Sequence, residues 1–474
     1  MGGEASYERL SAQDASFLQF ENAGTPSHVT AVAVFEGGGR AAGPLGGLDM
    51  ELVRAHVASR LHLLPHYRQR LARTPLQGHP IWVDDADFDL GCHIRHAGLP
   101  TPGDHARLKE LAGRIASQPL DRSRPLWELW FVEGLAGGGF AAIAKVHHCM
   151  VDGVSGVGVL QALLSPDAGQ PLEVAVPWTP RPAPGRLTFL ADGVVGGAEF
   201  SASLVREAAG ALLSPRETLG RALGGAGAAL LTLRGGLVPP ADSPLNRPIG
   251  QQRRVEWTGF DLHELRDLRK RLDGSLNDVL LAVVAGTLRR YLQRRGVKLR
   301  GLELRVVVPV DMRGGQVDLR VGNRVSSWFV DLPVGESRPA RRFERIRAQT
   351  RRLKRTEAAQ AIDGFMRFAD WTGSSSLTFL GVNLIGAIRP YNLVVTNVHG
   401  PQFPLYLLGA PLREFHPLLP LFERQGLALA AMSYLGRVSF GLSADWNLVP
   451  DVHEIPPLLG ESIAELQRIA TTRR

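Results

Sequence analysis

The feature that most constrains the fold is an apolar run that ends in a short polar motif. The run Phe140 to Val146 predicts a buried strand. Residues His147 to Gly153 follow directly and read His-His-Cys-Met-Val-Asp-Gly. The spacing and small residues of Val154 to Leu164 then favour a packed helix. The sequence therefore places two adjacent histidines at the end of a strand, just before the turn into a helix.

The residue types at this turn suit general-base catalysis. An imidazole has an ordinary pKa of about 6.5 and can take a proton near neutral pH. The tight Asp152-Gly153 turn can supply groups that fix the tautomer, and Gly153 permits close backbone approach or a positive φ. Metal ligation and a satisfied core pair are the alternatives. Metal binding would need a third ligand, and Cys149 would point to the opposite side of an extended segment from His148.

Length and composition set the class of protein. A chain of 474 residues is too long for one ordinary core and predicts two domains. Two cysteines, Cys92 and Cys149, exclude a disulfide framework and predict a reducing cytoplasm. Met1 to Leu10 lacks the apolar core of a secretory signal. No apolar run reaches the roughly 20 residues that span a bilayer. We therefore expect a cytoplasmic protein that meets any lipid from the surface.

Proline and glycine divide the chain. Between Ser165 and Gln252, prolines bracket two stretches rich in Ala, Gly and Leu. We predict an N-terminal domain over residues 1–170, a linker with weak helices over residues 171–250 and a C-terminal domain over residues 251–474. Strands and helices mix in both halves, which is typical of an α+β fold. Two interpretations of the linker stay open: a surface that docks on lipid, or a connection packed on the protein.

Local signals place several elements. Asp49 can cap a helix through about Leu64, and Asp104 can open another. Ser275 is expected to cap a long buried helix with Asp278 at its third position. We expect a further helix over Asp261 to Leu272. The main strands are expected at His28 to Phe35, Trp127 to Val132, Leu302 to Val310, Val325 to Leu332, Leu393 to Val398, Leu427 to Tyr434 and Val438 to Ser443.

The motif His147 to Gly153 resembles the HHxxxDG signature of the chloramphenicol acetyltransferase-like superfamily, which includes the condensation domains of peptide synthetases. Other stretches resemble the bacterial wax ester synthase/diacylglycerol O-acyltransferase family more narrowly. They are residues 10–17, Pro125-Leu126-Trp127, Asn277-Asp278 and residues 308–314, 322–325 and 396–401. At His399 the family more often has proline. The resemblance covers nearly the whole chain and implies two such domains, joined by a helical linker, with the active site at their interface.

This resemblance implies an acyl-CoA-dependent O-acyltransferase that passes a long-chain acyl group to diacylglycerol, a fatty alcohol or both. Such a reaction needs a base for the hydroxyl proton and donors for the oxyanion. His148 matches the general base of the family, and His147 matches the flanking histidine with a positional role. The equivalent of Asp152 pairs with an arginine and shapes the site. Arg68 is the candidate partner by similarity to condensation domains.

Further site residues follow from the same resemblance. Asn277 is expected to donate to the oxyanion or to the substrate alcohol, at a helix N-terminus that favours negative charge. Asp278 is a substrate-binding candidate, with plain capping as the favoured alternative. The stretch Pro125-Leu126-Trp127 is expected to form a rigid apolar wall of the acyl channel. Glu21 is expected to reach Asn277.

The distribution of charge indicates which partners the protein could bind. Arg338 to Arg355 holds nine basic residues and one acidic residue, Glu344. It suits the phosphates of coenzyme A, anionic lipid headgroups or a solvated helix face, which is the usual case. The modest net charge of +8 and the lack of a recognition motif argue against nucleic acid. The resemblance implies acyl-CoA as donor, no metal or cofactor, and peripheral association with a membrane or lipid droplets.

Two other functions stay open from the sequence. A condensation-type acyltransferase would take the acyl group from a carrier protein instead of coenzyme A. A non-catalytic protein that binds lipid droplets would retain the fold without turnover, although an intact His148 argues against it.

Overall fold

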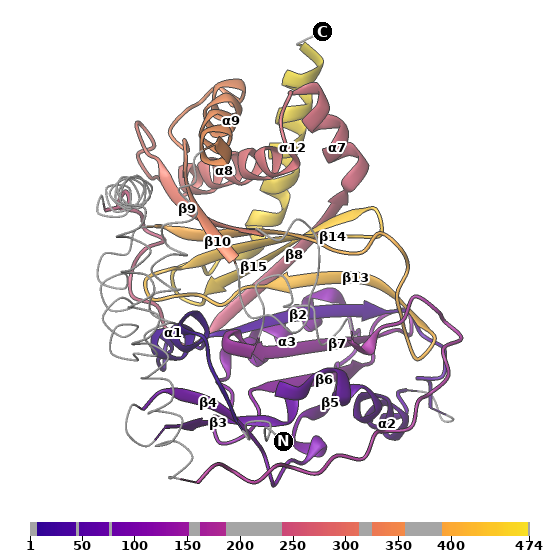
Figure 1. Cartoon of the computed structure of the whole chain (residues 1–474). Helices are drawn as coiled ribbons and strands as arrows, with labels where there is room; N and C mark the ends of the chain where they lie inside the picture. Colours follow the sequence, from indigo (N-terminus) through magenta and orange to yellow (C-terminus); the bar gives the residue numbers. More distant parts are fainter. Residues whose placement is uncertain are drawn as a thin grey trace, which may run out of the picture.

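The computed structural model describes residues 7–43, 47–74, 78–150, 162–185, 239–311, 325–355 and 391–472. These residues form two six-stranded sheets and one small three-stranded sheet, together with seven α-helices. Figure 1 shows the sheet of the N-terminal half below and the sheet of the C-terminal half, with its helices, above. No described helix is long and apolar enough to cross a membrane.

The first large sheet carries the histidine motif at the end of a central strand. Strand β7 pairs with β2 in antiparallel register, so that His147 is opposite His28 and Phe140 is opposite Phe35. The order is β12 (Tyr406–Leu407), β13 (Ala410–Leu418), β2 (His28–Phe35), β7 (Phe140–His147), β6 (Trp127–Glu133) and β5 (Ile94–Gly98). Helix α3 (His105–Ser117), capped by Asp104, covers one face. The expected buried strand before the motif is confirmed.

The other face of this sheet packs against a layer of helix and irregular chain. Helix α2 (Met50–Arg60) begins after the expected cap Asp49 but ends at Arg60, and two 3-10 turns follow it. These turns are η1 (Leu61–Leu63) and η2 (Pro65–Arg68), and η3 (Leu90–Cys92) follows later in the chain. Nearby, the small sheet joins β1 (Tyr7–Arg9), β4 (Pro80–Asp84) and β3 (Gln69–Arg73).

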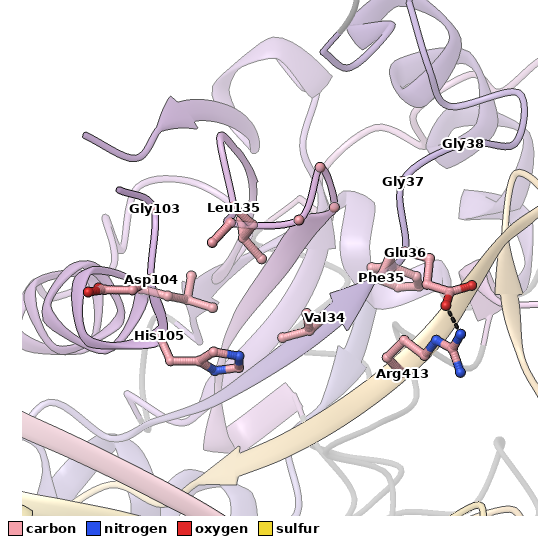
Figure 2. Close-up of a pocket in the computed structure, with 15 residues that line it drawn as sticks. Val34, Phe35, Glu36, Gly37, Gly38, Gly103, Asp104, His105, Leu135 and Arg413 are labelled. Atoms are coloured by element: carbon pink, nitrogen blue, oxygen red, sulfur yellow. Dashed lines mark ion pairs between the residues drawn. The ribbon is translucent and has the colours of Figure 1, made fainter. Parts of the chain in front are cut away.

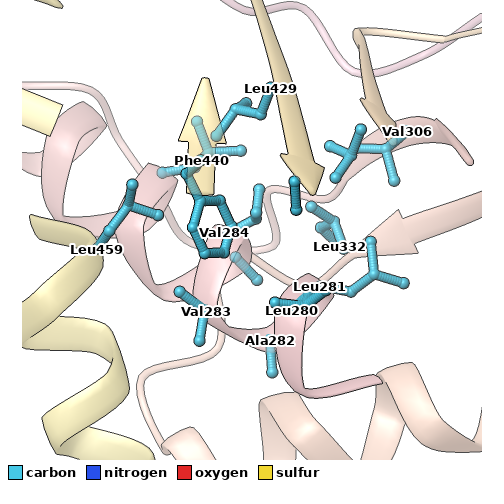
Figure 3. Packing of buried hydrophobic residues seen from close by; sticks show 14 of the residues in the cluster. Leu280, Leu281, Ala282, Val283, Val284, Val306, Leu332, Leu429, Phe440 and Leu459 are labelled. Atoms are coloured by element: carbon cyan, nitrogen blue, oxygen red, sulfur yellow. The ribbon is translucent and has the colours of Figure 1, made fainter. Parts of the chain in front are cut away.

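The second large sheet holds the largest apolar core. Its order is β10 (Val325–Leu332), β9 (Leu304–Asp311), β11 (Leu393–His399), β14 (Leu427–Tyr434), β15 (Arg437–Asp445) and β8 (Arg253–Asp261). The helices around it are α7 (Leu262–Arg271), α8 (Leu276–Arg294), α9 (Pro339–Arg355) and α12 (Ile455–Thr472), with the turn η5 (Val452–Glu454) before α12. In Figure 3, Val284 and Leu281 of α8 lie among strand residues such as Phe440 and Leu429. The fully apolar run of α8 is therefore buried.

Strand β13 does not follow the predicted division of the chain. Its sequence lies in the second half, but it pairs with β2 and extends the first sheet, with Phe415 opposite Ala33. At this crossing the two sheets touch, because a Cβ on Gly441 of β15 would lie 1.7 Å from the carbonyl oxygen of Pro417. The two halves are thus interlocked by strand exchange, which hydrophobic periodicity alone does not reveal.

The predicted linker is only partly described. Residues 186–238, which include both Ala/Gly/Leu-rich stretches, lie outside the described residues. The preceding residues, 162–185, cross the first sheet's outer layer, with Ser165 paired to Tyr406 at one end and Arg181 bound to Asp84 at the other. This segment packs on the N-terminal half. The predicted helix from Val154 onward also lies largely outside the described residues.

Candidate active site

Backbone hydrogen bonds hold the two histidines from both neighbouring segments. The amide of His147 donates to the carbonyl oxygen of Leu126 at 2.9 Å. The amide of His148 donates to the carbonyl oxygen of Ser27 at 2.8 Å. His147 ends β7, and His148 opens the 3-10 turn η4 (His148–Met150). The turn lets adjacent residues leave the sheet in different directions.

The His147 ring is buried, and its surroundings fix its tautomer. Its Nδ1 accepts the backbone N–H of Cys149 at 3.1 Å, and the Cys149 sulfur lies 2.9 Å from the same nitrogen. Burial raises the pKa of the Cys149 thiol well above its usual range, so it stays protonated. With Nδ1 accepting, Nε2 carries the proton, and it faces Oε2 of Glu21 at 3.3 Å.

Glu21 ends α1 (Ala12–Phe20) and is ionised in this position. Burial alone would raise its pKa, but hydrogen bonds and charge from His147 and Arg122 outweigh burial and lower the pKa to about 2. The Nε atom of Arg122 lies 3.0 Å from Oε2 of Glu21. Arg122, Glu21 and His147 therefore form a chain of charge-assisted contacts that ends at the histidine motif.

The His148 ring stacks on Phe17 of α1, with centroids 3.8 Å apart and an interplanar angle of 17°. Its Nδ1 is buried, and no hydrogen-bond partner reaches it within the described part of the chain. Burial, and secondarily the neighbouring His147, lower the pKa of His148 to about 4. The imidazole is therefore neutral at physiological pH, which is the form that accepts a proton.

Asp152 and Gly153 lie outside the described residues, so their predicted roles stay predictions. Arg68, the predicted partner of Asp152, is half-buried in η2, with its guanidinium 4.7 Å from the ring centre of Trp178. Burial lowers the pKa of Arg68, and the nearby Asp84 opposes that shift.

The Pro125-Leu126-Trp127 stretch contributes to the protein core next to the histidine motif. Leu126 and Trp127 are fully buried in the protein core. Trp127 stacks on His93 with centroids 4.5 Å apart, and its Nε1 donates to the carbonyl oxygen of Tyr67 at 2.8 Å. Leu126 packs in one cluster with Cys149. The stretch therefore packs beneath the histidine motif, and its expected role as a wall of the acyl channel stays a prediction.

Asp278 is occupied as a helix cap. Its Oδ2 accepts the amide of Ser275 at 2.7 Å while the Ser275 hydroxyl accepts the amide of Asp278, a complete capping box. Its Oδ1 accepts the Thr350 hydroxyl at 2.6 Å. Asp278 is buried and both of its oxygens are used, as the favoured capping alternative predicts, while a substrate-binding role stays a prediction.

Asn277 is half-buried in the same first turn of α8. The described contacts of Glu21 are with His147, Arg122 and Ser27, and do not include Asn277. The expected contact between Glu21 and Asn277 is therefore not among those that the structure describes. The role of Asn277 at the oxyanion stays a prediction.

The basic run of residues 338–355 contains α9 (Pro339–Arg355), and Arg342, Arg345, Arg347 and Arg351 form ion pairs. Arg347 Nη1 and Arg351 Nη2 lie 3.1 and 3.0 Å from Oδ2 of Asp273, and Arg345 pairs with Glu303. Phe343, Ile346 and Thr350 line its buried side. These contacts support the solvated helix face among the three interpretations of the run.

A separate pocket of about 620 Å³ lies at the opposite end of β2 from the histidines. Figure 2 shows His105 and Val34 facing its centre, with the ion pair of Glu36 and Arg413 at one side. The β2 register places Phe35, which lines the pocket, seven steps from His28, or about 23 Å along an extended strand. The pocket is therefore distinct from the histidine motif.

Arg122, Ser27 and Phe17 were missed by sequence reasoning. Arg122 lies in the same stretch as the Pro-Leu-Trp residues, but nothing local marks it as the partner of Glu21, which is distant in the chain. Phe17 lies within the family-like residues 10–17, so that resemblance pointed to the segment but not to the stacking contact.

The fold and this geometry define a class of enzyme. A neutral histidine lies at the end of a buried strand, in the sequence pattern HHxxxDG, and its neighbour is fixed by an ionised glutamate. This is the site of a chloramphenicol acetyltransferase-like acyltransferase.

The chain belongs to the wax ester synthase/diacylglycerol acyltransferase family. Residues 10–280 match its catalytic domain and residues 321–467 match its C-terminal domain. A Mycobacterium tuberculosis protein named as a diacylglycerol O-acyltransferase is 34% identical, over 98% of this chain and 91% of that protein. A similarly named Mycobacterium bovis protein is 30% identical, over 98% of this chain and 97% of that protein.

Solved structures confirm the predicted fold class. The wax ester synthase/diacylglycerol acyltransferase from Marinobacter aquaeolei VT8 has a TM-score of 0.66 at 24% identity, covering 98% of this chain and 100% of that one. The first condensation domain of the calcium-dependent antibiotic synthetase has a TM-score of 0.61 at 15% identity, covering 99% and 97%. The protein is an acyltransferase with two chloramphenicol acetyltransferase-like domains.

Proposed function

We propose that this protein transfers a long-chain acyl group from acyl-CoA to diacylglycerol, a fatty alcohol or both, with His148 as the general base. The observation that carries the proposal is the state of the two histidines. His148 is neutral, and His147 beside it is fixed by Glu21. A neutral imidazole at this position can take the proton of an acceptor hydroxyl.

The proposed reaction needs no covalent enzyme intermediate. His148 takes the hydroxyl proton as the acceptor oxygen bonds to the thioester carbon. The tetrahedral intermediate then breaks its carbon–sulfur bond, and the coenzyme A thiolate takes the proton from the imidazolium. An ester and coenzyme A leave, so atoms and charges balance without a metal or other cofactor. In this scheme Asn277 donates to the oxyanion, while Asp152, paired with Arg68, and Gly153 shape the turn.

The proposal also covers the location of the enzyme in the cell. Diacylglycerol and long-chain alcohols reside in lipid phases, so we propose a cytoplasmic protein that associates peripherally with a membrane or lipid droplet. Support comes from the lack of any membrane-spanning helix among the described residues, together with the lipid acceptors implied by the family.

An acceptor panel tests the function. Purified protein is incubated with a long-chain acyl-CoA and, separately, with diacylglycerol and a fatty alcohol, and free coenzyme A is measured with a thiol reagent. We expect acceptor-dependent release that His148→Ala abolishes. Release with neither acceptor, or activity only with carrier-protein thioesters, would contradict the proposal.

A further inference from the structure

An extended segment over residues 162–185, here called the strap, crosses the outer layer of the first sheet. It is fixed along its length by contacts with several elements. Ser165 pairs with Tyr406, the Gln170 carbonyl oxygen accepts from Arg40, Glu173 Oε1 lies 3.1 Å from Arg60 Nη1, and Arg181 binds Asp84. These contacts hold the strap in one place on the surface.

The middle of the strap turns apolar side chains toward solvent. Leu172, Val174 and Val176 are 37%, 91% and 54% exposed, while Glu173 between them is held by Arg60. Leu63 lies three residues after Arg60 and is 44% exposed. Exposing these aliphatic side chains to water costs free energy. The strap thus keeps a charged residue tied to the protein and presents three aliphatic residues outward.

Three other large apolar residues of the described chain are also exposed. Trp446 is covered by the Arg254 guanidinium at 3.5 Å. Leu435 donates its amide to the carbonyl oxygen of Pro401, and Phe403 lies three residues before Tyr406, which pairs with Ser165 of the strap. Four of the seven large exposed apolar residues of the described chain therefore lie on the strap or in η1 beside it.

This side also connects to the histidine motif through packing. The cluster under the strap contains Leu163 and Leu164 from the strap itself and Leu61 from η1. Met150, two residues after His148, packs against the same cluster. The beginning of the strap and Met150 therefore share one core.

We propose that the outer face of the strap, formed by Leu63, Leu172, Val174 and Val176, is the surface by which this protein rests on a lipid phase. The proposal builds on the proposed function, which requires acceptors from such a phase. The apolar side chains would enter the interfacial region of the lipid surface.

The features of the strap suit binding to a lipid surface better than binding to another protein. Prolines 171, 177, 180, 182 and 184 lack amide donors, so the strap is a poor edge for pairing with a strand of another chain. Four protruding aliphatic side chains also present much less than the roughly 800 Å² per partner of a standard protein interface. Apolar side chains that stand out singly suit insertion between lipid headgroups.

Vesicle flotation tests the surface directly. The double variant Val174→Ser/Val176→Ser is compared with wild type and with the matched neighbour Ala175→Ser on vesicles of phosphatidylcholine and phosphatidylglycerol. We expect the double variant to bind about tenfold or more weakly, since each valine contributes apolar burial. Ala175→Ser should bind like wild type. Equal binding by the double variant would overturn the proposal.

A soluble assay separates this proposal from the catalytic one. With acyl-CoA and a short water-soluble alcohol, wild type and double variant should have the same kcat and KM, because the strap does not contact the histidines. If wild type shows no turnover but vesicle binding still depends on Val174 and Val176, the proposed function fails and the docking surface stands. A lowered kcat in the soluble assay, with unchanged flotation, would assign the strap to the active site and overturn docking.

A fluorescent probe on the strap distinguishes a lipid surface from another part of this chain or a second copy of it. Val174→Cys, in a Cys92→Ser background, is labelled with an environment-sensitive dye. We expect a blue shift of the emission only when vesicles are added. A blue shift without vesicles would show that this chain or a second copy covers the strap and would overturn the proposal, and size-exclusion chromatography would identify which.

Discussion

Oε2 of Glu21 lies 3.3 Å from Nε2 of His147 and joins the end of α1 to the end of β7. Nε of Arg122 lies 3.0 Å from the same oxygen. The flanking histidine therefore faces an ionised carboxylate from a different part of the chain, while His148, the proposed base, is held by stacking on Phe17.

Replacing Glu21 should weaken both the fold and the reaction. Glu21→Leu removes the carboxylate that accepts from Arg122 Nε and faces the His147 ring, which should lower the free energy of unfolding by about 1.5–3 kcal/mol. Glu21→Gln keeps an acceptor and should cost less. Urea unfolding and kcat measure the two effects, with Glu110→Gln on the exposed face of α3 as control. Equal stability of Glu21→Leu and wild type would contradict this assignment.

Removing the two histidines should have unequal effects. His148→Ala should lower kcat by roughly 10² to 10⁴, the usual range for a general base. His147→Ala should cost less, because its role is positional. Single-turnover kinetics with saturating acyl-CoA would measure both, and circular dichroism would check the fold. Equal losses at both positions would refute the division of roles.

The pH dependence follows from the lowered pKa of His148. A pKa of about 4 means that the imidazole remains unprotonated as the pH falls below 6.5, and becomes protonated only near pH 4. The acidic limb of kcat/KM should therefore lie well below 6.5. An initial-rate profile with soluble substrates measures it, and a limb centred at 6.5 would show that the base is solvated like a free imidazole.

The stability of the fold should also depend on pH through Glu21. Its pKa is lowered from 4.5 to about 2, so its contribution is complete above 4.5 and is lost as the pH falls from 4.5 toward 2. Glu21→Gln should remove this part of the acid sensitivity. Thermal unfolding of both proteins across that interval is the measurement, and parallel curves would exclude the contribution.

Asp278→Ala should act on stability alone. Loss of the capping box should lower the free energy of unfolding by about 0.5–2 kcal/mol, and loss of the Thr350 contact adds to it. Asp261→Ala, which removes the cap of α7, is the matched control. Both should lower Tm with KM for acyl-CoA unchanged. A raised KM in Asp278→Ala only would restore the substrate-binding role.

The sequence predicted those features of the fold that depend on residues close together in the chain. The apolar run before His147 became β7, and the Ser275 and Asp278 signals became a complete capping box. The Arg122 contact with Glu21 could not be predicted, because it joins segments far apart in the chain. The exchange of β13 was also missed, since β13 and β2 are ordinary strands whose pairing depends on the register of the whole sheet.

The exchange of β13 has a consequence for how the protein is made. Until residue 418 has left the ribosome, β2 has β7 on one side and an unpaired edge on the other. Such an edge can pair with other chains. The first half is therefore completed only after most of the second half has been synthesised, and a fragment ending at residue 250 should aggregate. Added in trans, a fragment carrying β13 would rescue it, so the two halves share a single assembly step.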